Sequence, residues 1–147
     1  MTRAENAKNN FLSGYNCTQA VALAFSDLID LSKEKILAVC LPMGGGMGRL
    51  RQTCGAVSGA ALCIGMIFAG ISKNECYALV QEFARRFVAR NGSINCGELL
   101  SGAHLKVDTS PIAEERTPEY YKKRPCPDLI FDAAEILEEM LKEQNKA

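Results

Sequence analysis

The sequence lacks tryptophan, has a single histidine and is poor in aromatic residues, which make up 7% of its 147 positions. Nucleic-acid-binding surfaces use stacked aromatic side chains and clustered positive charge. Here Lys+Arg and Asp+Glu both number 17, so the net charge is zero and we expect no nucleic-acid partner. With His104 as the only histidine, which we place at the surface, a Cys–His hydrolase is also disfavoured.

The longest stretch without a charged residue runs from Gln52 to Ser72. A bilayer span needs about 20 predominantly apolar residues, whereas the middle of this stretch is rich in glycine and alanine and lacks aromatic belts at its ends. We therefore predict no membrane insertion and expect a buried central helix here. The first ten residues contain no apolar core of a secretory signal, so we expect a cytoplasmic protein.

Apolar residues recur at helical spacing along most of the chain, which predicts an all-α protein. With 48% hydrophobic residues the chain can build one core, so we predict a single domain over residues 1–147, a compact multi-helix bundle around the Gly/Ala-rich central helix. The expected helices cover residues 4–13, 17–29, 33–41, the central stretch, 73–91, 96–102 and the region from 127 onward. Residues 103–125 are expected to form a long, partly ordered loop, with Lys122-Lys123-Arg124 as a solvated run; a ligand-binding role for this run is the less favoured alternative.

Four of the seven cysteines lie where a helix is predicted to begin: Cys17, Cys54, Cys96 and Cys126. We call them the four helix-start cysteines. A helix N-terminus carries partial positive charge, favours thiolate and can lower a cysteine pKa. None of them forms a C-x-x-C pair, so neither the thioredoxin nor the zinc-finger pattern is present. If their helix ends converge, the thiolates could exchange as disulfides or hold a metal or an iron–sulfur cluster.

The other three cysteines fall within predicted helices beside apolar neighbours: Cys40, Cys63 and Cys76. Free cysteine is among the most buried residue types. We therefore interpret these three as packing residues. Seven cysteines in a reducing compartment favour metal binding or transient redox work over a framework of structural disulfides.

A glycine-rich loop lies before Cys54 and contains Gly44, Gly45, Gly46 and Gly48. It is neither a P-loop nor a dinucleotide-binding fingerprint. Glycines permit positive φ angles and close backbone approach, so we predict that this glycine loop wraps a ligand or cluster and brings N–H donors to sulfur. The alternative is a tight connection between helices. Arg49 and Arg51 either provide positive charge near thiolates or are exposed charges.

Five short blocks follow one another along the sequence. They are Tyr15-Asn16-Cys17, Gly44-Gly45-Gly46-Met47-Gly48, Cys54-Gly55-Ala56-Val57-Ser58-Gly59, Asn95-Cys96-Gly97-Glu98-Leu99-Leu100 and Cys126-Pro127. In this order the blocks resemble the C_GCAxxG_C_C family of redox-active proteins. The resemblance implies a small helical protein whose four characteristic cysteines correspond to the four helix-start cysteines. It also implies a role in electron transfer and names no substrate.

We predict a redox-active protein that uses the four helix-start cysteines in electron transfer with a redox partner protein. In one version all four are iron–sulfur cluster ligands; in the other they form a dithiol/disulfide couple in which one cysteine attacks and a neighbour resolves. The alternatives are a structural zinc site, a non-catalytic partner-binding helical domain, and a domain in which the cysteines only pack. The Gly/Ala-rich central helix is compatible with a homodimer.

Overall fold

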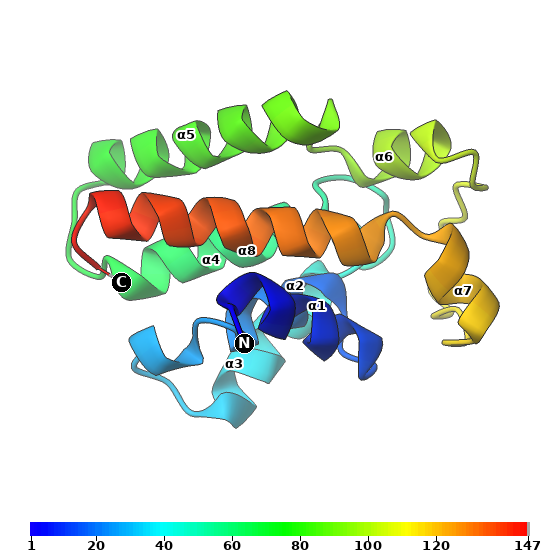
Figure 1. Cartoon of the computed structure of the whole chain (residues 1–147), viewed down its shortest axis with the longest axis horizontal. Helices are drawn as coiled ribbons and strands as arrows, with labels where there is room; N and C mark the ends of the chain where they lie inside the picture. The colour runs from blue at the N-terminus through cyan, green and yellow to red at the C-terminus, as the bar shows by residue number, and fades with distance from the viewer. Residues whose placement is uncertain (147) are drawn as a thin grey trace.

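The computed structural model describes residues 1–146, and its regular structure over these residues is helical (Figure 1). The elements in chain order are α1 (Arg3–Leu12), α2 (Cys17–Leu23), η1 (Ser26–Leu28), α3 (Lys33–Cys40), η2 (Leu41–Met43), α4 (Gly55–Ile67), α5 (Lys73–Asn91), α6 (Cys96–Gly102), α7 (Pro118–Lys123) and α8 (Cys126–Glu143). The β-type pairing in this part of the chain is one isolated bridge between Thr53 and Asn95. The all-α prediction is confirmed.

Side-chain caps fix where several helices begin. Asn16, Ser72 and Asn95 each accept a hydrogen bond from a backbone N–H in the first turn of α2, α5 and α6. Such a cap is worth about 1 kcal/mol, because it satisfies a donor that the helix cannot pair internally. The predicted starts of these helices are therefore confirmed, and each start is specified by residues next to it in the sequence.

The second predicted helix, residues 17–29, is wrong in its length, because α2 ends at Leu23. The backbone N–H groups of Ala24 and Phe25 bond to carbonyls three residues back, which tightens the last turn. Phe25 then leaves the helical region at φ −116°, ψ 13° and is fully buried. Burial of this ring thus accompanies the end of a helix that the apolar spacing would have continued.

The loop predicted over residues 103–125 holds a short helix, α7. Thr117 caps it by accepting a backbone hydrogen bond, and Pro118 occupies the first turn, where its missing N–H costs nothing. The prediction of a solvated Lys122-Lys123-Arg124 run holds for the two lysines, which are exposed. It is wrong for Arg124, whose side chain is only 8% exposed.

The core lies where α8 packs against α1, α2, α4 and α5. Figure 1 shows α5 and α8 side by side, with α6 and α7 at one end of this pair. The largest fully buried side chains come from nearly every helix: Phe11, Val21, Phe25, Ile36, Ile64, Phe83, Phe87, Leu100, Ile130, Ile136, Leu137 and Leu141. Each such side chain contributes about 1.5–3 kcal/mol on burial, so apolar packing holds the helices together.

The Gly/Ala-rich helix is α4, and it contacts α2, α5 and α8. Its residues from Gly55 to Ala60 are all buried. The prediction of a buried central helix is confirmed for this part of α4. Within the described residues no helix combines the length and the apolar character that a bilayer crossing requires.

Candidate functional site

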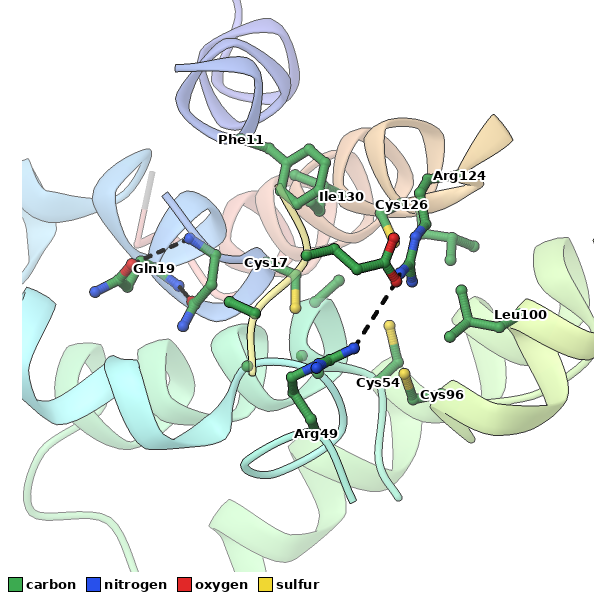
Figure 2. A pocket seen from close by; sticks show the side chains of 18 of the residues that line it. Phe11, Cys17, Gln19, Arg49, Cys54, Cys96, Leu100, Arg124, Cys126 and Ile130 are labelled. Atoms are coloured by element: carbon green, nitrogen blue, oxygen red, sulfur yellow. Dashed lines mark hydrogen bonds and ion pairs between the residues drawn. The ribbon is translucent and has the colours of Figure 1, made fainter. Parts of the chain in front are cut away.

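The four helix-start cysteines line one cavity of about 490 Å³, which we call the cysteine cavity. Three of them are the first residues of α2, α6 and α8, and the fourth occupies the N-cap position of α4. Figure 2 shows their sulfur atoms approaching the cavity from four separate helices. The expected convergence of distant helix ends is therefore present in the structure.

Backbone hydrogen bonds set Cys54 and Cys96 next to each other. The N–H of Cys54 donates to the carbonyl of Ile94 at 2.7 Å, and the N–H of Cys96 donates to the carbonyl of Gln52 at 2.5 Å. These two bonds flank the isolated bridge described above. The segment before α4 thus pairs with the segment before α6, and both helices start at the same place.

Cys17 reaches this place because Gly55, the residue after Cys54, has no side chain. A Cβ built at Gly55 would collide with the Cys17 sulfur. One turn along α4, a Cβ at Gly59 would lie 2.9 Å from the carbonyl oxygen of Thr18. The two glycines of the Cys-Gly-Ala-x-x-Gly block therefore allow α4 to pack directly against the start of α2.

The glycine loop follows a left-handed path, with φ of 67° at Gly45, 71° at Gly46 and 55° at Gly48. Glycine adopts this conformation without steric cost. Gly44, Gly45 and Gly48 line the cysteine cavity. Gly46 packs closely against one of the cavity cysteines. A Cβ built at Gly46 would lie 2.7 Å from the Cβ of Cys96.

The expectation that helix starts lower the cysteine pKa is wrong for three of the four thiols. Burial raises the pKa of Cys54 well above its usual range, with a further increase from the neighbouring Cys17, and it raises the pKa of Cys126 to about 12. Burial also raises the pKa of Cys17, although a hydrogen bond from the backbone of Gly45 acts in the opposite direction. Loss of water around a thiolate outweighs the helix terminus here.

Arginine side chains line the same cavity and supply its positive charge: Arg49, Arg51, Arg116 and Arg124. Arg51 is 7% exposed, and its Nη1 lies 3.8 Å from the sulfur of Cys96. The exposed-charge alternative is therefore wrong for Arg51. Arg51 thus directs an N–H group and a positive charge at a cysteine sulfur inside the cavity.

Sequence reasoning missed Arg116 and considered Arg124 only in the less favoured ligand-binding alternative. Arg116 donates to the carbonyls of Phe11 and Tyr15 at 3.1 Å each and lies 4.3 Å from the centre of the Phe11 ring. Nothing near Arg116 in the sequence indicates this placement. The sequence did contain a signal for Arg124, because this residue stands two positions before the cysteine that begins α8.

The remaining cysteines and the histidine lie away from the cavity lining. Cys40 and Cys63 are fully buried in the core, Cys76 is half-buried and His104 is exposed. These positions agree with the packing interpretation of Cys40 and Cys63. All seven cysteines are free thiols, and within residues 1–146 no three His, Cys, Asp or Glu side chains are grouped closely enough to hold a single metal ion.

The sequence blocks, the helix starts and the shared cavity define a small all-α protein with a four-cysteine site. A family model described as "Putative redox-active protein (C_GCAxxG_C_C)" matches residues 15–140. The chain belongs to this family. Comparison with curated proteins and with solved structures found no match.

Proposed function

We propose that the cysteine cavity is the redox centre of this protein and that the four helix-start cysteines bind an iron–sulfur cluster. One observation carries the proposal: four thiols that are distant in sequence line a single cavity together with arginine side chains. Cysteine thiolates are the usual ligands of iron–sulfur clusters. The family match supports redox activity, and the cluster is our assignment.

Four cysteine thiols can serve either an iron–sulfur cluster or a structural zinc ion, so the spacing of the sulfur atoms has to separate the two. A zinc site made of four cysteines holds all four sulfurs about 2.3 Å from one metal, and no three candidate ligands in the described part of the chain are grouped so closely. In a cluster the thiolates bind different iron atoms, so they lie further apart than around one ion. The zinc interpretation is therefore the weaker one.

A bound cluster would supply one-electron chemistry. The protein must hold the cysteine sulfurs in the thiolate form, although burial in the cavity favours the neutral thiol. Metal coordination removes the thiol proton. Arg51 directs an N–H group and a positive charge at the Cys96 sulfur, and the backbone of Gly45 lowers the pKa of Cys17 against the effect of burial. Such charges and hydrogen bonds tune the potential of a cluster.

A dithiol/disulfide couple is the second candidate, because the Cys17 sulfur lies against the residue that follows Cys54. Oxidation would join the two Sγ atoms, release both thiol protons and pass two electrons to an oxidised partner protein. The raised pKa of both thiols leaves little thiolate at neutral pH. We therefore place this couple second.

Anaerobic purification followed by iron and acid-labile sulfide assays tests the cluster. We expect stoichiometric iron, visible absorption bands, and loss of both in the Cys54→Ser variant. Cys76→Ser is the matched control, because Cys76 is half-buried outside the cavity, and this variant should retain the iron. Metal-free protein whose thiol count falls by two on oxidation would support the disulfide couple. Neither iron nor a change in thiol count would contradict both candidates.

A further inference from the structure

Two arginines from separate elements converge on one carboxylate at the cysteine cavity. Arg124, the C-cap residue after α7, donates to Oε1 of Glu114, and Nη2 of Arg49 lies 3.8 Å from the same oxygen. Figure 2 shows both arginines beside the cysteine sulfurs. The two arginine side chains are 8% and 13% exposed, whereas the side chain of Glu114 is 45% exposed. Two cations that are mostly shielded from water thus share one half-exposed anion.

Arg49 has a donor group that its surroundings leave unused. Its Nη1 donates to the carbonyl of Ser110 at 2.6 Å and to the carbonyl of Ile112. Its Nη2 is buried and has no hydrogen-bond partner among the residues the structure describes. Asp108 is 3.9 Å away, too far for a hydrogen bond. A buried charged donor without an acceptor is unfavourable, so this position favours a further anionic acceptor.

Glu114 is the member of this group that can leave. It lies in the irregular segment between α6 and α7, and its carboxylate is nearly half exposed to water. Arg49 is held by the carbonyls of Ser110 and Ile112 in this same segment, so the segment stays in place and only the side chain of Glu114 turns away. Arg124 packs over the ring of Tyr120 at 4.8 Å. Removing Glu114 from the site would leave the paired guanidinium groups in place.

We propose that Arg49 and Arg124 form the binding site for the carboxylate of a small-molecule substrate, and that Glu114 occupies this site while the substrate is absent. Guanidinium groups match a carboxylate with paired N–H donors. The site already holds one carboxylate, and both arginines line the cysteine cavity, whose volume of about 490 Å³ leaves room for the rest of a small molecule beside the cysteines. The inference deepens the proposed function, because it names the substrate class of the redox centre.

Titration of the reduced, full-length protein with sodium propionate tests the site. Propionate reproduces the end of a glutamate side chain, and sodium chloride keeps the ionic strength constant. Binding is followed by ¹H–¹⁵N NMR shifts. Glu114→Gln should bind propionate at least about tenfold more tightly than the wild type, because a tethered competitor has been removed. Glu119→Gln, a nearby exposed carboxylate variant, should bind as the wild type does.

The contribution of Arg124 to binding is tested in the Glu114→Gln background. There, Arg124→Gln should weaken propionate binding at least about tenfold. If that variant does not fold, Arg124→Lys keeps the charge but loses the paired donors, and it should also weaken binding. Equal affinity in the wild type and Glu114→Gln, or shifts that chloride alone reproduces, would overturn the proposal. Iron content and thiol counts are measured separately, so failure here is distinguishable from failure of the redox function.

Discussion

Replacing Gly55 with alanine should disturb both the fold and the cysteine cavity. A Cβ at this position would collide with the sulfur of Cys17 and would lie 2.8 Å from Oγ1 of Thr18. Because α4 is packed directly against α2, the added methyl group must push Cys17 aside or separate the two helices. Both movements change the position of one of the four helix-start cysteines.

The size of the effect follows from two opposing terms. Overpacking a buried position costs about 1–3 kcal/mol, and replacing glycine by alanine in a helix returns about 0.5–1 kcal/mol. The two terms together give a net loss between zero and about 2.5 kcal/mol in the free energy of unfolding, and we expect a value near the middle of that range, about 1–2 kcal/mol. For a chain of this size, that loss corresponds to a fall of about 3–6 °C in melting temperature.

Gly65 provides the matched control within the same helix. It is exposed, and a Cβ built there would meet nothing within 4 Å. Gly65→Ala should therefore gain about 0.5–1 kcal/mol through helix propensity alone. Thermal and urea unfolding measure both variants, and iron content after anaerobic purification reports the cysteine site. Only the Gly55 variant should lose iron.

Equal stability of the two alanine variants would refute the reasoning, because it would mean that α4 and α2 are not in contact at this position. A Gly55→Ala protein that is destabilised but fully iron-loaded would refute a narrower point. It would show that Cys17 does not need its present position to bind a cluster.

Two further predictions concern the thiols. In the metal-free, reduced protein, burial raises the pKa of Cys40 to about 11 and that of Cys126 to about 12, against about 8.5 in an unfolded chain. Above that pH the folded state keeps protons that the unfolded state releases. The urea midpoint should therefore be level from about pH 6.5 to about pH 8.5 and fall as the pH rises from there. A rising midpoint would contradict these shifts. When the wild type and the variants are all purified anaerobically in the same way, Cys17→Ser and Cys54→Ser should be coupled by about 0.5–3 kcal/mol in unfolding free energy, because loss of either cysteine disrupts the same site. Additive effects would indicate that these cysteines only pack.

The helices and the positions of the four helix-start cysteines followed from the sequence, because both depend on local interactions. Apolar spacing and caps such as Ser72 and Asn95 act within a few residues of each helix start. The same reasoning failed at α2, where burial of Phe25 accompanies an early end, and at α7, which lies in a charged segment without helical apolar spacing. The end of α2 depends on contacts with distant parts of the chain, whereas α7 has a local start signal, the Thr117 cap followed by Pro118, which the prediction did not use.

Tertiary structure determines that the four helix-start cysteines share one cavity. Cys54 and Cys96 meet because backbone segments far apart in sequence pair, and Cys17 joins them where Gly55 lets two helices touch. The thiol pKa values reversed the local expectation, since burial removes water from a thiolate more effectively than a helix terminus stabilises it. Sequence alone placed each cysteine at a helix start, because a start is specified within one turn. Their shared environment required the packing of four helices, which no local pattern encodes.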